Sequence, residues 1–397
     1  MGATLRILCL CFYFEPDLSA GSFKNSALVR ELGRQVPEGS QVEVITTLPN
    51  RYASFAVDAP LEEHWGNIRI RRVALPGHQS GMVDQSRSFA TYARVVMKMT
   101  RSEDYDLVYS SSSRLMMSVL GGLVSWRKKI PFYLDIRDIF VDTIKDVLPA
   151  KITFLAMPVL SRLEKWAVRR ASRVNVVSGG FVSYFEHHFP GIELSGFTNG
   201  IDEEFLEAAP AEAAPITREV PEVLYAGNMG EGQGLHHIIP PLAKAFEGKL
   251  TFRLIGGGGR LQQLKDNLEA AGCNNVILQE PVPRQELIKV YADADILFLH
   301  LNDYEAFKKV LPSKIFEYGA LGKPVWAGVG GFSASFIREH LSNSAVFPPC
   351  NVDEAVKSFD SLEMKMEPRI EFTDRFARSR IIKNMASEII ATSAQNR

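Results

Sequence analysis

Short apolar runs alternate with helical patterns along nearly the whole chain. In the first half, runs of strand length lie at residues 6–14, 42–48, 68–75, 107–111, 132–138 and 174–178. Patterns with a helical period lie between several of them, at about 22–35, 86–100, 114–126, 158–170 and 180–188. This alternation is typical of α/β proteins, in which helices connect parallel strands and cover the sheet.

A second series of the same kind begins near residue 223. Its strand candidates lie at 223–227, 250–256, 276–279, 296–301, 324–329 and 345–349, again with helices between them. Residues 206–222, which separate the two series, are rich in Ala, Pro and Glu and show no period, as a linker does. The pattern therefore predicts two doubly wound domains, 1–205 and 206–372, and a polar helical tail at 373–397 that packs on a surface.

Composition changes this picture little. With 397 residues, of which 46% are hydrophobic and 23% charged, the chain is long enough for two cores and typical of soluble globular proteins. Its formal net charge of −1 argues against a general nucleic-acid binder. The apolar run 7–14 is too short for a membrane span or a signal-peptide core. The cysteines lack metal-ligand spacing and indicate a reducing compartment: Cys9, Cys11, Cys273 and Cys350. We therefore expect a cytoplasmic protein.

Doubly wound sheets bind ligands at the carboxyl ends of their strands, where helix N-termini favour phosphate. The first such turn, residues 14–32, contains Gly21, which would allow close approach of a ligand, and a helix that starts near Ser22. An ordinary strand-to-helix turn explains this segment about equally well.

Two glycine-rich turns follow strands of the second series. One carries Gly227, Gly230, Gly232 and Gly234, and the other has four consecutive glycines at 256–259. The second turn fails the dinucleotide fingerprint, because the third glycine would fall at Leu261. Two such turns in successive units favour close approach of a phosphate or a sugar.

A single carboxylate stands in the apolar segment "VLPSKIFEYGALGKPV" at 310–325. Glu317 could form an exposed pair with Lys314, three residues away, but its neighbours are apolar and the flanking strands look buried. An unpaired buried charge is costly, and the two vicinal hydroxyls of a ribose would satisfy both carboxylate oxygens. The backbone amides expected to face a diphosphate are those of Val310, Leu311 and Ser313.

Charged residues also end a strand of the first series, where Asp135, Arg137 and Asp138 predict a polar cluster. An Arg–Asp pair that holds the next loop is nearly as good an explanation. The strings "DYD" at 104–106 and "DAD" at 293–295 match a metal-binding DxD pattern, but both precede a strand, so we expect caps and turns and no divalent metal.

These segments together resemble the retaining family 4 glycosyltransferases of the GT-B fold. The resemblance covers essentially the full chain and rests on the loop with Gly21, "NGID" at 199–202, "YAGNMGEGQGL", "LIGGGG", "YADADILFL" and "PSKIFEYGALGKPV". The last segment resembles bacterial enzymes that build O-antigen or capsular polysaccharide, particularly the branch that handles N-acetylated amino sugars such as L-fucosamine. The resemblance implies two Rossmann-like domains facing across a cleft, an N-terminal acceptor domain and a C-terminal donor domain, with the C-terminal helix returning to the first.

In this family the glutamate matching Glu317 holds the donor ribose. The donor-binding residues that the resemblance implies, together with the turns described above, are Glu317, Ser313, Lys314, Leu311, Val310, Asn228, Gly230, Gln233, Gly257, Gly258, Arg260 and Val282. The acceptor or phosphate loop would carry Gly21 and Ser22, and the residues assigned to catalysis are Asp138, Lys309 and Glu305.

The chain departs from the family pattern at two places. The family usually has a first glutamate where this chain has Lys309, so the usual contact to the donor-sugar hydroxyls is either absent or supplied by Asp303 or Glu305. Many members carry Arg and Lys where this chain has Asn228 and Gln233. The diphosphate would then depend on backbone amides and on lysines of one segment: Lys308, Lys309 or Lys314.

The activity implied is transfer of a sugar from a nucleotide sugar with retention, without a metal or another cofactor, and with UDP favoured over GDP. The leaving diphosphate would help to take the acceptor's proton, while the protein positions both substrates and stabilises charge. Two other functions stay open: a UDP-sugar epimerase on the same scaffold, and a non-catalytic nucleotide-sugar-binding module.

Relatives that build polymers act on lipid-linked acceptors at the inner face of the cell membrane. Residues 151–173 contain six basic residues and one acidic residue. An apolar stripe runs at helical spacing through Leu155, Val159, Leu163 and Trp166. We expect the stripe to pack on the sheet of the first domain, and attraction of the charges to anionic lipid remains a hypothesis.

Overall fold

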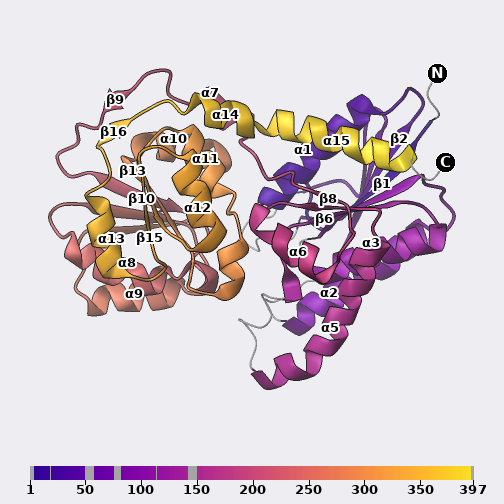
Figure 1. Ribbon diagram of the computed structural model, residues 1–397, viewed down its shortest axis with the longest axis horizontal. Coiled ribbons are helices and arrows are strands. Elements are labelled where there is room, and N and C mark those ends of the chain that lie inside the picture. The colour runs from indigo at the N-terminus through magenta and orange to yellow at the C-terminus, as the bar shows by residue number, and fades with distance from the viewer. Residues whose placement is uncertain are drawn as a thin grey trace. The chain divides into compact units, whose positions relative to one another are not determined.

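The computed structural model describes residues 4–17, 19–49, 58–75, 82–112, 114–141 and 150–394. The chain divides into two compact units, the first formed by Met1–Asn199 and Ser379–Arg397 and the second by Gly200–Arg378 (Figure 1). The second unit thus begins before residue 206 and ends after residue 372, where the sequence had placed its limits. The reason is a bridge between its ends: the Ile201 NH donates to the Phe376 carbonyl, and the Arg378 NH donates to the Ile201 carbonyl.

The first unit is built on a twisted sheet with the strand order β3-β4-β2-β1-β5-β6-β7-β8. Its strands are β1 (Arg6–Cys11), β2 (Gln41–Thr47), β3 (Glu62–Trp65), β4 (Ile68–Val73), β5 (Leu107–Ser112), β6 (Phe132–Ile136), β7 (Arg173–Val176) and β8 (Leu194–Ser195). All neighbours pair in parallel except β3 and β4. Because β3 is an edge strand with alternating exposed residues, it carries no apolar run, and the sequence pattern missed it.

Helices connect the strands of this unit and pack against the sheet: α1 (Ala20–Gln35), α2 (Met82–Met99), α3 (Leu115–Lys128), α5 (Ala150–Arg170), a short turn η1 (Gly179–Phe181) and α6 (Val182–His188). The chain order reverses between β1 and β5, because β2 lies on one side of β1 and β5 on the other. In doubly wound sheets, such a switch point opens a crevice at the carboxyl ends of the strands.

The C-terminal helix α15 (Arg378–Ala394) belongs to the core of the first unit and lies beside α1 (Figure 1). Its residues Ile382, Met385, Ala386 and Ile389 are buried in the cluster that also contains residues of β1 and β2. The expectation of a polar surface helix therefore underestimated its apolar face.

Helix α5 corrects another expectation. The stripe through Val159, Leu163 and Trp166 does not pack on the sheet: 57% of Val159 and 38% of Trp166 are exposed. The buried face lies one position further along, at Glu164, Ala167 and Val168. Tyr184 makes this arrangement favourable, because its hydroxyl donates a hydrogen bond of 2.6 Å to the buried Glu164 carboxylate. The side chain of Leu155 lies outside the described residues.

The second unit contains a fully parallel sheet with the order β12-β11-β10-β13-β14-β15. Its strands are β10 (Glu222–Ala226), β11 (Thr251–Ile255), β12 (Val276–Gln279), β13 (Ile296–His300), β14 (Val325–Gly328) and β15 (Ser344–Phe347). The order again reverses, here between β10 and β13. The turns after these two strands should therefore border a ligand crevice.

The helices of the second unit cover both faces of this sheet (Figure 1). They are α7 (Glu203–Glu207), η2 (Glu231–Gln233), α8 (Leu235–Ala245), α9 (Leu261–Ala270), α10 (Arg284–Asp293), η3 (Glu305–Lys309), α11 (Lys314–Ala320), α12 (Gly331–His340), α13 (Val352–Phe359) and α14 (Ile370–Phe376). Part of the predicted linker is paired, since β9 (Ala214–Pro215) forms a short antiparallel ribbon with β16 (Lys365–Met366). The doubly wound α/β class predicted from the sequence is confirmed for both units. Over the described ranges, the helices lack the combination of length and hydropathy that crossing a bilayer requires.

Candidate functional site

Glu317 lies in the first turn of α11, the helix that connects β13 to β14. The apolar residues around it, Ile315, Phe316 and Tyr318, are buried, whereas Glu317 itself is half-buried. The Tyr291 hydroxyl of α10 donates a hydrogen bond of 3.3 Å to one of its carboxylate oxygens. Among the described residues this is the one hydrogen bond of the Glu317 side chain, so its other oxygen can accept a donor from a ligand.

The surroundings of Glu317 hold both apolar mass and positive charge. Burial raises the pKa of Glu317, and the cations of Lys314 and Arg284 oppose this shift. The Arg284 guanidinium forms ion pairs with Asp202 and Glu204. Arg284 is thus engaged with two other carboxylates. Lys314, three residues before Glu317, is the cation that can act together with Glu317 on a ligand.

Lys314 points toward the first glycine-rich turn. Its amine lies over the Tyr225 ring, 5.4 Å from the centroid, and a side chain at Gly227 would collide with it. Burial lowers the pKa of Lys314, with Glu317 opposing. Since Gly227 has a φ of 150°, glycine is required here for backbone conformation as well as for space.

The rest of this turn is fixed by contacts within the protein. The Asn228 amide donates to the Gln233 side-chain carbonyl at 2.8 Å, and the Gly230 NH donates to the same oxygen at 3.2 Å. A Cβ at Gly232 would lie 3.0 Å from the Phe307 ring, and Gly234 has a positive φ of 59°. Protein contacts thus explain most of the glycines that the sequence had suggested for ligand approach.

The second glycine-rich turn packs directly on the first. The Met229 NH donates to the Gly257 carbonyl at 2.8 Å. A Cβ at Gly256 would overlap the Gly227 carbonyl, and one at Gly258 would lie 2.6 Å from the Met229 carbonyl carbon. A Cβ at Gly257 or Gly259 would meet nothing within 4 Å. These two open positions are the places where a ligand could approach the backbone of this turn.

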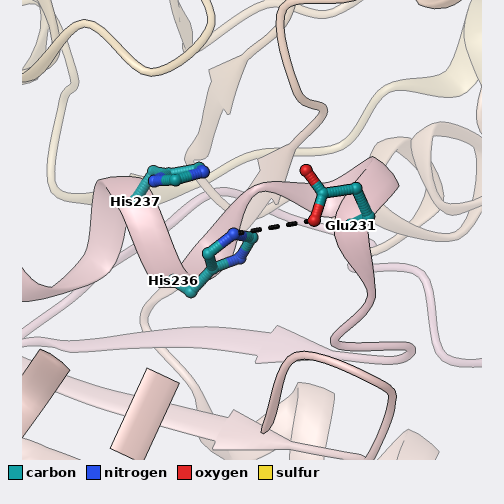
Figure 2. Close-up of side chains that lie close together, drawn as sticks. All are labelled: Glu231, His236 and His237. Carbon is teal, nitrogen blue, oxygen red and sulfur yellow. Dashed lines mark ion pairs between the residues drawn. The ribbon is translucent and has the colours of Figure 1, made fainter. Parts of the chain in front are cut away.

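Arg260 directly precedes α9 and is held by the first glycine-rich turn. Its Nε forms an ion pair of 2.5 Å with Glu231, whose other oxygen accepts the Tyr304 hydroxyl at 2.7 Å. Glu231 also lies near His236 and His237 at the start of α8 (Figure 2). Arg260, predicted to bind the donor, is therefore engaged with a carboxylate.

His300 is a residue that the sequence reasoning missed. It ends β13, is fully buried, and joins two turns: its Nδ1–H donates to the Gln233 carbonyl at 2.7 Å, and its Nε2 accepts the Cys350 NH at 2.9 Å. Burial lowers the pKa of His300 to about 4, so the ring is neutral near pH 7. A polar residue inside the apolar run "ILFLHL" was the available signal.

The segment before α11 contains the remaining predicted residues of this unit. Ser313 and Val310 are half-buried and Leu311 is buried, and the Val310 carbonyl accepts a hydrogen bond from the Ser333 hydroxyl. Lys309 is half-buried in η3, whereas Glu305 is 80% exposed and paired with Lys308. Of the other two residues named from the sequence, Asp303 is exposed and Val282 is half-buried.

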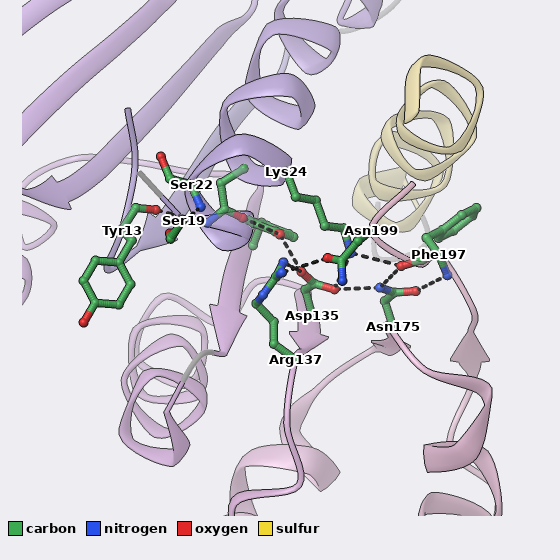
Figure 3. Close-up of polar contacts among 11 residues, drawn as sticks. Tyr13, Ser19, Ser22, Lys24, Asp135, Arg137, Asn175, Phe197 and Asn199 are labelled. Carbon is green, nitrogen blue, oxygen red and sulfur yellow. Dashed lines mark hydrogen bonds and ion pairs between the residues drawn. The ribbon is translucent and has the colours of Figure 1, made fainter. Parts of the chain in front are cut away.

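In the first unit, Asp135 is the centre of a buried polar network at the end of β6 (Figure 3). It pairs with Lys24 at 3.1 Å and accepts a hydrogen bond from Asn175 at 2.6 Å. Lys24 and Asn175 also donate to the Phe197 carbonyl. Although burial disfavours the charged carboxylate, Lys24 and Arg137 hold the pKa of Asp135 below its usual value.

This network serves structure. Asp135 and Lys24 are both inaccessible to solvent, and together they tie α1, β6, β7 and the segment at 197 to one another. Arg137 donates to Asn199 at 2.8 Å and stays 3.9 Å from Asp135. The charged residues at this strand end thus belong to a polar cluster, but the cation closest to Asp135 is Lys24, and Arg137 does not form the close pair with Asp135 that the alternative required.

Three other predicted residues belong to the first unit. Ser22 is buried, and its NH donates to the Ser19 side chain that caps α1, so this amide already has a partner. Gly21 is half-buried, and a Cβ there would lie 3.6 Å from Arg137. Asp138 reaches solvent, yet the surrounding protein raises the pKa of its carboxyl to about 6 while Arg137 opposes the shift.

As expected, an aspartate of each DxD string accepts a backbone hydrogen bond at the start of a strand. Asp106 accepts the Arg6 NH at 2.8 Å, and Asp295 accepts the Glu222 NH at 2.8 Å and pairs with Arg218.

Two protein-family models match the chain, one in each half. A model described as a glycosyl transferase 4-like domain matches residues 26–192, and a model described as glycosyl transferases group 1 matches residues 211–378. A comparison with curated proteins found no match.

Solved structures share the fold over the full length. Sucrose-phosphate synthase from Thermosynechococcus elongatus has a TM-score of 0.66 at 15% identity, covering 99% of this chain and 97% of its own. HepE from Anabaena in complex with UDP-glucose has a TM-score of 0.66 at 15% identity, covering 98% and 100%. WaaG, a glycosyltransferase involved in lipopolysaccharide biosynthesis, has a TM-score of 0.63 at 13% identity, covering 98% of each chain.

Proposed function

We propose that the chain, whose two halves match glycosyltransferase family models, is a glycosyltransferase of the GT-B fold that transfers a sugar from a UDP-sugar, with retention, to a lipid-linked or saccharide acceptor. The acceptor would be part of a surface polysaccharide such as O-antigen or capsule, and the sugar an N-acetylated amino sugar. The segment "PSKIFEYGALGKPV" supports this finer assignment, since it resembles enzymes of that branch.

The observation that carries the proposal is the half-buried carboxylate of Glu317, which among the described residues accepts one hydrogen bond, from Tyr291. A ribose offers two adjacent hydroxyl donors, which match the free lone pairs of this carboxylate. Hydrogen bonds to charged groups contribute about 1.5–3 kcal/mol. Two such bonds are sufficient to fix the nucleoside beside α11.

The diphosphate of the donor would then lie near Lys314. The Lys314 amine faces the turn at Gly227, and the open backbone at Gly257 and Gly259 leaves room for phosphate oxygens. During transfer, negative charge grows on the leaving diphosphate, and a cation held at a fixed position stabilises it. We propose that the diphosphate oxygen takes the acceptor's proton on the same face of the sugar, without a metal.

UDP is the nucleotide that we propose, because HepE, which shares this fold, has been captured with UDP-glucose and with UDP. In the first unit we propose Asp138 as the residue that contacts the acceptor or the donor sugar. A carboxyl with a pKa near 6 can exchange a proton with a hydroxyl near neutral pH.

A membrane-bound acceptor would suit the surface formed by α3 and α5. Trp126 of α3 is 59% exposed, and Trp166 of α5 lies over Gly122 with 38% of its surface exposed. Exposed cations stand on the same helices: Arg127, Arg162, Lys165 and Arg169. Tryptophan and basic residues together favour the interface of an anionic bilayer.

The test is thermal unfolding of the full chain with UDP, GDP, ADP and their sugars, followed by transfer assays. A ligand that binds only the folded state raises the apparent stability. We expect UDP and UDP-N-acetylhexosamines to raise Tm and a pyrophosphate-lipid acceptor to receive the sugar. Isomerised sugar without transfer would indicate an epimerase, and binding without turnover a non-catalytic module; either result would overturn the proposal.

A further inference from the structure

Glu231, His236 and His237 bring three ligand atoms together where η2 meets α8. One carboxylate oxygen and one nitrogen from each imidazole all lie within 4.8 Å of one another (Figure 2). The two adjacent rings have their centroids 4.0 Å apart. No sequence motif indicated this cluster, because its spacing, a glutamate five residues before a His–His pair, matches no common metal signature.

His236 is the member that packing alone does not explain. Only 2% of it is exposed, and within the described part of the chain its side chain makes no hydrogen bond. Its Nδ1 is buried without a partner, and its Nε2 faces Glu231 at 3.9 Å. The Nε2, which faces the Glu231 carboxylate, is the candidate ligand atom, and a ligand bound there would leave Nδ1 as it is.

We propose that Glu231, His236 and His237 bind one divalent transition-metal ion of the zinc class, with water in the remaining position. Imidazole nitrogen and carboxylate oxygen are ligands that suit Zn²⁺, Co²⁺ and Ni²⁺. With bonds of about 2.0–2.1 Å, two ligand atoms in a tetrahedral site are roughly 3.4 Å apart. The observed 3.9 Å between His236 and Glu231 needs only a small contraction to reach this value.

The surroundings of Glu231 are suited to this role. The Tyr304 hydroxyl and the Asn302 amide donate to its Oε1, while its Oε2 faces His236 and is paired with Arg260. Hydrogen bonds of this kind orient a metal ligand and strengthen binding. His237 is exposed and can swing toward the ion from the outer side.

Arg260 is the competitor for this site, because its guanidinium pairs with the same Oε2 at 2.5 Å. A bound metal would replace Arg260 and join η2 to α8 through Glu231. The site thus holds the glycine-rich turn in place and takes no part in the transfer reaction. Removing Arg260 should therefore tighten metal binding, whereas removing a ligand should weaken it.

The test is Zn²⁺ titration of the full, tag-free chain against a chromogenic chelator, together with Co²⁺ absorption spectra. We expect one saturable site, with affinity lowered roughly tenfold or more in Glu231→Gln and His237→Ala. Arg260→Gln should bind roughly two- to five-fold more tightly, since an exposed ion pair competes only weakly. His237 is exposed, so its substitution should not disturb folding.

The matched control is His187→Ala, which alters another exposed histidine of an adjacent pair on a helix. It should leave Zn²⁺ affinity and the Co²⁺ spectrum unchanged. If Zn²⁺ does not saturate a single site at micromolar concentrations, or if His187→Ala weakens binding as much as His237→Ala, the proposal is wrong.

Discussion

The amine of Lys314 occupies the space that a side chain at residue 227 would need. The two residues come from different strand-to-helix turns, one after β10 and one after β13, and they meet at the reversal point of the second sheet. Glycine is therefore required at residue 227 for two reasons: the backbone has a positive φ there, and the adjacent space is taken by the cation proposed to hold the donor diphosphate.

Gly227→Ala should therefore lower UDP affinity in the same way as Lys314→Met, because the added methyl displaces the amine. We expect a loss of roughly tenfold for each, which corresponds to one charge-assisted hydrogen bond. The two changes together should cost little more than either alone, and isothermal titration with UDP measures this. Gly196→Ala is the control, since its Cβ would meet nothing within 4 Å. If the losses in binding free energy of the two variants were fully additive, Gly227 and Lys314 would not act through the same contact.

Glu317→Gln should weaken UDP binding roughly 10- to 100-fold, because a neutral amide replaces the acceptor of two ribose hydroxyls. It should change the free energy of unfolding far less, since the amide keeps the shape of the side chain and the contact with Tyr291. Urea unfolding and UDP titration on the same samples separate the two effects. Glu339→Gln, at an exposed position of α12, should change neither. If the wild type and Glu317→Gln bound uridine with equal affinity, the proposed contact between Glu317 and the ribose would be wrong.

The stability of the second unit should fall as the pH falls from about 6.5 to about 4, through His300. The pKa of His300 is lowered to about 4 in the folded chain, whereas the unfolded chain takes up this proton near 6.5. The unfolded state thus binds more protons in this window, and stability is present above it and lost below it. The contribution is at most about 3 kcal/mol.

His300→Gln removes this titration, so the difference in unfolding free energy between wild type and variant should shrink as the pH falls from 6.5 to 4. Chemical denaturation at several pH values measures this difference. A difference that stays constant would show that His300 is not the titrating group.

Lys24→Met should destabilise the first unit by about 3–5 kcal/mol, because it leaves the Asp135 carboxylate charged and buried. Lys24→Met combined with Asp135→Asn should recover part of that loss, since the buried charge disappears as well. Lys308→Met is the control: it breaks the exposed pair with Glu305 and should cost under about 1 kcal/mol. Guanidinium unfolding, with hydrogen exchange to follow the first unit, measures these stabilities. The prediction is wrong if the single and the double variant are equally unstable.

Trp126→Ser and Trp166→Ser should weaken binding to liposomes that contain anionic lipid, because each removes an exposed aromatic ring from the α3–α5 surface. Sedimentation with liposomes at low and at high salt measures the effect, and high salt should reduce binding of all variants. Phe332→Ser, on α12 of the second unit, is a control outside this surface. If the wild type ignored anionic liposomes at low salt, the membrane hypothesis would fail.

The sequence was sufficient for the parts of the fold that depend on local pattern. The buried strands β1, β5, β6, β10 and β13 contain runs of apolar residues, so their starts were predicted to within one residue, although the end of β1 was placed three residues too far. The edge strand β3 carries no such run and was missed, whereas the edge strands β12 and β15 were predicted. On α5, the spacing of the apolar residues predicted the wrong buried face. A periodic pattern does not show that a charged residue such as Glu164 has a partner, here the Tyr184 hydroxyl, and can therefore be buried.

For the site, the sequence by itself determined that Glu317 is an acid among apolar neighbours and that glycine-rich turns end two strands of one sheet. Only the tertiary structure decided which glycines face the protein and which are open, that Gln233 and Asn228 bind each other, and that Arg260 is held by Glu231. The same holds for Lys24 with Asp135 and for His300 with Gln233, which are far apart in the chain. The physical reason is that the cost of a buried polar group depends on its partner, and the fold, not the local sequence, brings the partner to it.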